Sequence, residues 1–267
     1  MKKKENGKWN NKIGIGIITT LVFIFIGVSN MNAAGFLGIG NTASWKEEVL
    51  LHDGSKIIVE RWQRHGGRRE PGQDPDISDQ SISFTIPGTN KSVKWKDEAS
   101  DELGGRVNFD LVALHIINNL PYIITTPHLC LSYNKWGRPN PPYIIFKYEG
   151  NEWKQIDMTE LPVEFKNINL VVNAGADDWK LVSQSIVSAD MVKKLNDELT
   201  QKEYKTIART PMEGVGCGVE VYDGTYWYGL SGLDKLPSYE ACVKVCGTKA
   251  KYCPCEKYFK TDSKGEK

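Results

Sequence analysis

The chain has 267 residues, and its 34 Lys and Arg against 33 Asp and Glu give a formal net charge of +1 at pH 7. Residues 1–34 contain five of the lysines and Glu5, so the rest of the chain has 29 basic and 32 acidic residues, a formal charge of −3. This mildly acidic body gives no electrostatic reason to expect nucleic acid or an anionic membrane surface as a partner. Its length suffices for one sizeable core, or for one domain with an appendage.

A lysine-rich start and an apolar segment open the chain. Residues 1–12, MKKKENGKWNNK, are followed by residues 13–28, which carry no charge. This pattern is typical of an export signal or a membrane anchor. The uncharged run is shorter than the roughly 20 residues that span a bilayer, but the apolar stretch AAGFLGIG follows it and a clean cleavage motif is absent. The pattern therefore predicts an exported body that is either held by residues 13–28 or released by cleavage.

Strand-like runs on either side of turn-forming residues predict five β-hairpins in the part of the chain that is expected to be exported. Asp-Gly and Asn-rich pairs favour tight turns because they tolerate positive φ. The predicted turns are Asp53-Gly54, residues 87–90, Asn118-Asn119, Gly150-Asn151 and Asp223-Gly224. We expect a mainly β fold, an antiparallel hairpin meander that forms a sandwich or a partial propeller-like sheet, with one or two helices and a small disulfide-stapled helical tail at the C-terminus.

One helix outside the tail is predicted to begin near Ser188. Met191, Leu195 and Leu199 follow at intervals of four residues, which places them on one helical face. We interpret this stripe as a packing face against the β body.

Six cysteines in an exported body predict three disulfides. A helix with Ser238 at its N-cap would place Cys242 and Cys246 about 6 Å apart on one face. An extended segment would place Cys253 and Cys255 about 6.6 Å apart on one face. These matched spacings predict the disulfides Cys242–Cys255 and Cys246–Cys253, and elimination leaves Cys130–Cys217. A four-cysteine zinc site in the tail is the alternative, disfavoured by the tight C-x-C spacing and by the oxidising compartment.

These features divide the chain into three predicted parts. Residues 1–40 form the signal or anchor segment, residues 45–210 a β-rich domain, and residues 211–267 a cysteine-rich appendage packed on that domain.

Catalytic motifs are missing from the sequence around its four histidines. His52, His65, His115 and His128 form no H-E-x-x-H pattern and no pair at metal-ligand spacing, and no G-x-S-x-G occurs. The sequence therefore indicates no catalytic residue, no metal ligand and no cofactor. A triad assembled from distant positions stays open as an alternative.

Two stretches are candidate binding surfaces. The first is a charged glycine loop with four arginines, which could clamp a carboxylate or phosphate: Arg61, Arg64, Arg68 and Arg69. The second is the proline-restricted loop of residues 132–143, whose aromatic and arginine side chains suit a peptide or a glycan: Tyr133, Trp136, Arg138 and Tyr143. The alternatives are a solvated loop for the first stretch and a stiff connector with packed aromatic rings for the second.

Three stretches together resemble a family of bacterial exported proteins from proteobacteria. They are WKEEVLLHDGSKIIVER, LSYNKWGRPNPPYIIFKYEGNEW and PSYEACVKVC, and the likeness covers most of the chain from about residue 45. The resemblance implies an envelope protein, either in the inner membrane facing the periplasm or periplasmic after cleavage. It implies no activity and no functional residues.

The expected function is therefore non-catalytic binding or assembly in the bacterial envelope, with an envelope protein, a peptide or a glycan as partner. The alternative is an envelope hydrolase with a His/Asp or Ser/His site. A pocket with a histidine within hydrogen-bond reach of Ser, Asp or Glu would favour the hydrolase. An exposed aromatic patch without such a pair would favour binding.

The leader pattern makes a first prediction. Residues 1–45 fused to a reporter enzyme that is active only outside the cytoplasm should give active reporter, because the lysine cluster and the apolar run direct export. Reporter activity in whole cells is the measurement. A soluble, inactive fusion in the cytoplasm would contradict the prediction, and replacing the apolar run with a polar sequence provides the matched control.

Overall fold

The computed structural model describes residues 42–66, 76–172, 181–217, 219–222, 227–230, 232, 235–246 and 255–259. The predicted export segment at residues 13–28 lies outside these ranges, as do Arg68, Arg69 and Cys253. No helix within the described ranges is long and apolar enough to cross a membrane.

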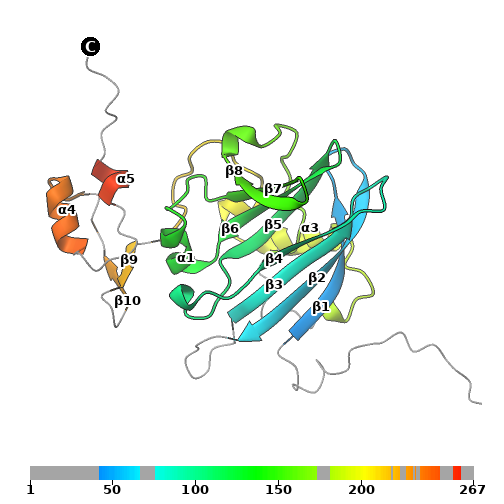
Figure 1. Cartoon of the computed structure of the whole chain (residues 1–267), viewed down its shortest axis with the longest axis horizontal. Coiled ribbons are helices and arrows are strands. Elements are labelled where there is room, and N and C mark those ends of the chain that lie inside the picture. The colour runs from blue at the N-terminus through cyan, green and yellow to red at the C-terminus, as the bar shows by residue number, and fades with distance from the viewer. Residues whose placement is uncertain are drawn as a thin grey trace, which may run out of the picture. The chain divides into compact units, whose positions relative to one another are not determined.

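Two four-stranded antiparallel meanders form the β body (Figure 1). The first sheet consists of β1 (Thr42–Leu50), β2 (Lys56–Gly66), β3 (Asp76–Thr85) and β4 (Ser92–Asp97). The second consists of β5 (Phe109–Ile117), β6 (Leu120–Pro127), β7 (Ile144–Glu149) and β8 (Glu152–Ile156). In each sheet the spatial order follows the chain. The predicted mainly β meander is confirmed.

Shorter elements connect and follow the sheets. Their bounds are η1 (Asp101–Leu103), α1 (Leu129–Lys135), η2 (Met158–Glu160), α3 (Ala189–Glu198), η3 (Lys202–Tyr204), β9 (Val219–Tyr222), β10 (Trp227–Leu230), α4 (Tyr239–Cys246) and α5 (Cys255–Phe259). β9 and β10 pair antiparallel, which confirms the fifth predicted hairpin, although its turn lies outside the described residues.

The hairpin turns form where the sequence supplies residues that tolerate positive φ. Asn118 and Asn119 have φ values of 52° and 60°, and Gly150 and Asn151 have 60° and 72°. Two consecutive residues with positive φ suit the right-handed twist of the flanking strands. The local turn chemistry therefore fixes which strands pair.

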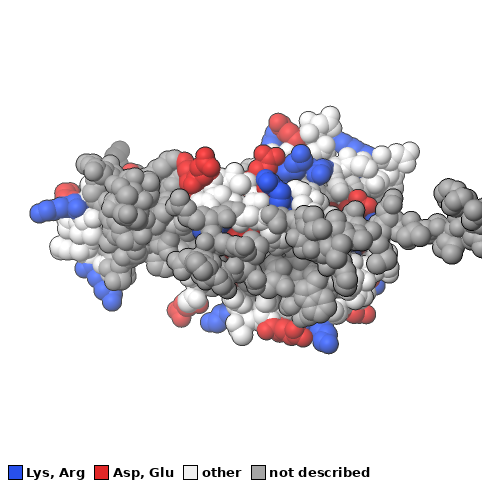
Figure 2. Space-filling model, turned by 90° about the horizontal axis from the view of Figure 1, so that it is seen from below, with Lys and Arg blue, Asp and Glu red and all other residues white. Residues whose placement is uncertain are grey.

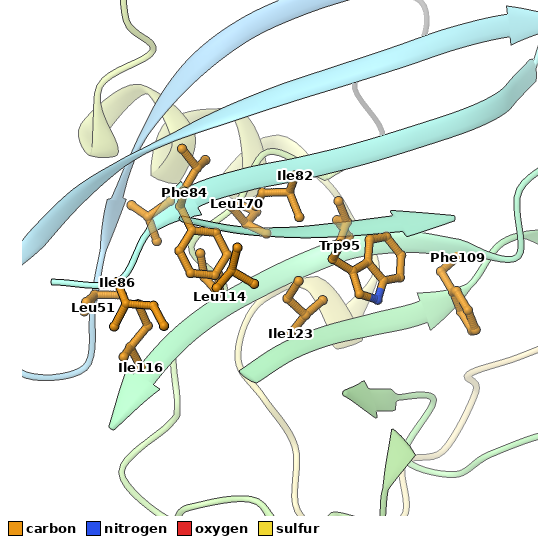
Figure 3. Close-up of a cluster of buried hydrophobic side chains, with 14 of the residues drawn as sticks. Leu51, Ile82, Phe84, Ile86, Trp95, Phe109, Leu114, Ile116, Ile123 and Leu170 are labelled. Carbon is orange, nitrogen blue, oxygen red and sulfur yellow. The ribbon is translucent and has the colours of Figure 1, made fainter. Parts of the chain in front are cut away.

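The two sheets pack face to face, as in a β-sandwich. Figure 3 shows side chains of the first sheet and its connecting turns directed at side chains of the second. The labelled members of this cluster are Leu51, Ile82, Phe84, Ile86, Trp95, Phe109, Leu114, Ile116, Ile123 and Leu170. The sandwich alternative of the prediction is thus the one observed among the described residues.

The second sheet is covered on its outer side as well. Phe165, Tyr204 and Ile207 come from the segments after β8 and α3, and they cluster with Tyr122 and Ile124 of β6. Burial on both faces explains why eight of the nine residues of β5 are buried.

Helix α3 begins where the sequence predicts it. The Ser188 hydroxyl accepts a hydrogen bond from the Met191 backbone N–H at 3.3 Å, a standard N-cap contact. Met191 and Leu195 pack with Trp45 of β1 in a third apolar cluster. The predicted packing role of the helical stripe is confirmed for these two residues.

One helix is a correction to the prediction. Residues 132–143 were expected to form a single stiff loop, but residues 132–135 belong to α1, which starts at Leu129. The helix has only seven residues, which is too few for a helical period to be detected in the sequence. The prolines that follow it favoured the prediction of a loop instead.

Two of the three predicted disulfides are confirmed, Cys130–Cys217 and Cys242–Cys255. The predicted third pair lies outside the described residues because it includes Cys253. Cys255 is the first residue of helix α5 and not part of an extended segment, which corrects the geometry expected for it. Because Cys242 and Cys255 are bonded to each other, they are not free thiolates, and the four-cysteine zinc alternative is wrong.

A buried ion pair lies within the inner face of the first sheet. The Arg61 Nη1 donates to the Glu47 Oε1 at 3.0 Å, and these side chains are 2% and 0% exposed. The same carboxylate accepts from the Trp45 indole at 2.7 Å and from the Val171 backbone N–H at 3.1 Å. Arg61 was expected on an exposed loop, and its burial corrects that expectation.

This ion pair gives a second prediction, tested with Arg61→Met. The substitution leaves Glu47 charged and buried without its cation, so unfolding should require about 3–5 kcal/mol less free energy. Lys56→Met is the matched control, because it breaks the more exposed 2.7 Å pair between Lys56 and Glu48 and should cost at most about 1 kcal/mol. Urea denaturation measures both variants, and equal losses would contradict the prediction.

Candidate functional site

The candidate site is built around the crossover from β4 to β5, where Asn108 connects three segments. Its side-chain amide donates to the Asp97 Oδ1 at 2.9 Å, at the end of β4. Its Oδ1 accepts from the Lys135 Nζ at 2.9 Å and from the Trp136 indole at 3.3 Å, both at the end of α1. Its backbone carbonyl accepts from the His128 backbone N–H at 2.8 Å. The start of α1 is thereby held against the crossover.

The other oxygen of the Asp97 carboxylate also supports the crossover. Asp97 Oδ2 accepts from the Phe109 backbone N–H at 2.8 Å. Burial raises the pKa of Asp97, although these donors, above all the Asn108 side chain, favour the charged form. The net direction shows that the low-dielectric interior outweighs the hydrogen bonds.

His128 and Asp110 form a pair beside this crossover. The His128 Nδ1 lies 2.9 Å from the Asp110 Oδ1, and the side chains are 12% and 8% exposed. Burial, the largest single effect, lowers the pKa of His128, but the adjacent Asp110 carboxylate together with Asp76 outweighs it, so the pKa is raised above its usual 6.5. The Nε2 atom is buried and has no hydrogen-bond partner among the described residues. The ring is therefore oriented through Nδ1 alone.

A half-open pocket of about 300 Å³ adjoins this pair. Its wall is made of two basic or titratable side chains, three leucines and a disulfide cysteine: Arg106, His128, Leu103, Leu129, Leu131 and Cys130. Arg106 forms an ion pair with Asp76. The volume is at the lower end of the range for small-molecule sites.

Leu129 is unusual within this wall. It is 52% exposed, and its φ of 56° is uncommon for a residue with a side chain. Backbone strain of this kind concentrates at functional sites, where the surrounding contacts hold it. Here the neighbours are His128 on one side and the disulfide of Cys130 on the other.

The aromatic loop proposed from the sequence is mostly packed. Tyr133 and Tyr143 are buried, and the Tyr143 hydroxyl donates to the backbone carbonyls of Glu203 and Thr206. Burial raises the pKa of Tyr143 to about 12. These two tyrosines are therefore not a binding surface, and the packing alternative is correct for them because their hydroxyl and ring contacts are internal.

The other two members of that loop also make internal contacts. The half-buried Trp136 ring lies 4.7 Å from the Phe109 ring, between centroids. The Arg138 guanidinium lies 4.9 Å from the centre of the Tyr133 ring and donates to the Cys217 carbonyl. Arg138 thus reinforces the region that the Cys130–Cys217 disulfide ties down.

The four arginines proposed from the sequence do not form one described cluster. Arg61 is buried with Glu47, whereas Arg64 is exposed and paired with Asp79 on the neighbouring strand. Arg68 and Arg69 lie outside the described residues.

Sequence reasoning missed Arg106 and the pairing of His128 with Asp110. His128 stands two residues before Cys130, and a histidine so close to a predicted disulfide was the signal that could have located the pocket wall. His115 has a different role: its ring stacks on Phe165 at 4.7 Å, and burial lowers its pKa to about 4. No group of three or more potential metal ligands occurs among the residues that the structure describes.

No protein-family model, no curated protein and no solved structure matches this chain. The chemistry of the site therefore has to be inferred from its own residues.

The His128–Asp110 pair gives a third prediction. Asp110→Asn should lower the pKa of His128, because burial is then opposed only by the weaker effect of Asp76. NMR titration of the histidine Cε1–H signals measures this shift. Asp79→Asn removes the partner of Arg64 and should leave the His128 titration unchanged, whereas an unshifted His128 in Asp110→Asn would contradict the assigned cause.

Proposed function

We propose that the protein is a non-catalytic component of the bacterial envelope that binds another envelope component at the pocket beside α1. The partner class is a peptide or a glycan, either free or part of an envelope protein. The body would face the periplasm, anchored by residues 13–28 or released from them.

The disulfides support an exported location. Cys130–Cys217 and Cys242–Cys255 are consistent with an oxidising compartment outside the cytoplasm. The lysine-rich leader supports the same location independently, because it precedes an uncharged run.

The pocket is the observation that carries the binding function. Its wall combines three leucines with Arg106 and His128, the mixture of apolar surface and a few polar groups that small-ligand sites use. Figure 2 shows Lys and Arg interspersed with Asp and Glu on the face in view, where the coloured residues form no large field of one sign. Recognition by local contacts suits such a surface better than long-range electrostatic attraction.

An envelope hydrolase is the second candidate, favoured by the His128–Asp110 pair. A carboxylate on Nδ1 orients a histidine so that Nε2 can exchange a proton with substrate. Two observations weigh against it. Nε2 is buried, and no serine, threonine or cysteine side chain in the described residues bonds to it; the nearby Ser132 hydroxyl donates instead to the Asn108 carbonyl.

A fourth prediction tests binding in the cell. The full chain with a photo-crosslinking phenylalanine derivative in place of Leu129 should form adducts with an envelope component after irradiation, because this position is exposed in the pocket wall. Val163 is the matched control, since it is 75% exposed and does not line the pocket. We expect several-fold more adduct at 129 than at 163, measured by mass spectrometry.

Two results would overturn the proposal. Equal adduct at the two positions would remove the pocket from the binding function. Turnover of chromogenic esters, glycosides or peptides by the purified protein, lost in a folded His128→Gln variant, would establish the hydrolase instead.

A further inference from the structure

We propose that the pocket recognises a carboxylate at the end of a short apolar group, with Arg106 binding the anion beside the charge of His128 and the three leucines contacting the apolar part. The inference rests on the proposed function, since it names the ligand chemistry of the same pocket. A peptide C-terminus with an aliphatic last residue has this chemistry and belongs to the partner class proposed above, whereas a short fatty acid has the same chemistry but lies outside that class.

The arrangement of charges selects an anion. Arg106 and His128 line the pocket, whereas their carboxylate partners, Asp76 and Asp110, are not part of the lining. Two basic or titratable residues thus contribute to the wall, whereas the carboxylates that pair with them do not. A guanidinium can bind a planar carboxylate through two parallel hydrogen bonds, which distinguishes it from a simple positive charge.

His128 contributes charge more than a hydrogen bond. Its Nε2 is buried, while part of its ring reaches the pocket wall. The groups that set its charge are Asp110 and Asp76, which favour the protonated ring, and Arg106, which opposes it. Because the carboxylate ligand stays ionised above about pH 5, affinity should fall as the pH rises through the raised pKa of His128.

The apolar side of the wall limits the size of the ligand. Leu103 is buried at the end of η1, and Leu129 is exposed at the start of α1. A volume of about 300 Å³ suits a single aliphatic side chain or a short acyl chain better than an extended polymer. Leu131 adds further apolar surface to the wall, which a bare inorganic anion would not contact favourably.

The first experiment uses the unmodified protein with matched ligand pairs. N-acetyl-L-leucine should bind at least tenfold more tightly than N-acetyl-L-leucinamide, because only the acid carries the charge. Octanoate against 1-octanol repeats the comparison for an acyl chain. NMR titration gives the affinities, and the shifted signals should include Leu103, Leu129 and Leu131. Tighter binding of N-acetyl-L-leucine than of octanoate would indicate a peptide C-terminus, and the reverse would indicate a fatty acid.

Variants then assign the anion contact to Arg106. The double substitution Arg106→Gln with Asp76→Asn removes the ion pair without changing the net charge, and it should weaken acid binding about tenfold while leaving the neutral ligand unchanged. The matched control is Arg64→Gln with Asp79→Asn, which removes an Arg–Asp pair that does not line the pocket. In His128→Gln the affinity should no longer fall as the pH rises through the range in which His128 of the unmodified protein titrates.

The outcomes separate this inference from the proposed function. If the unmodified protein binds the acid and the amide with equal affinity, the inference of a carboxylate ligand is wrong, and no variant is needed to show this. Full discrimination retained in the folded Arg106 double variant would overturn the role of Arg106. If adducts form at position 129 but the protein binds the acids no more tightly than the neutral ligands, the binding function is retained and the carboxylate ligand class is excluded.

Discussion

The hydrogen bonds of Asn108 hold together the segments on which the site depends. At the crossover between the sheets, this side chain bonds the end of β4 through Asp97 and the end of α1 through Lys135 and Trp136. Asp97 is buried, and leaving it without this partner would cost about 1–3 kcal/mol. The contacts therefore fix the start of α1 relative to the sandwich, and His128 receives its position from the same residue through the backbone.

The inner face of the first sheet changes character along its strands. One row across the sheet consists of Ala43, Gln63, Gln80 and Asp97, as the strand register shows. Further along the strands, Val59, Phe84 and Val93 belong to the apolar main core, and the register places the buried Glu47 opposite Val59. The row that ends at Asp97 is buried and is matched by polar contacts at the crossover, because Asp97 accepts from the Phe109 backbone N–H and the Gln80 amide donates to the Phe109 carbonyl.

Local features of the fold follow from the sequence, and the site does not. The Asn118-Asn119 turn and the Ser188 cap are determined by neighbouring residues, so both are predictable. Strand β2 shows where the hydrophobic pattern misleads: Arg61 and Gln63 point inward, while Ile58 is exposed on the outer face. The cost of burying the Arg61 charge is offset by Glu47, which lies on another strand. The residue pattern of a single strand cannot show such a partner in advance. The His128–Asp110 pair likewise depends on the register of β5 with β6.

The oxidation state and the geometry of the pocket are linked through one disulfide. Cys130 lines the pocket two residues from His128, and its partner Cys217 lies 87 residues further along the chain. Closing a loop of this length restricts the unfolded chain and contributes about 4–5 kcal/mol on the chain-entropy model. The bond also ties the segment that bears Leu129 to a second segment, which Arg138 contacts through the Cys217 carbonyl. A protein made in a reducing compartment would lose this tie at the pocket wall, so the compartment indicated by the leader is the one in which the site is covalently held.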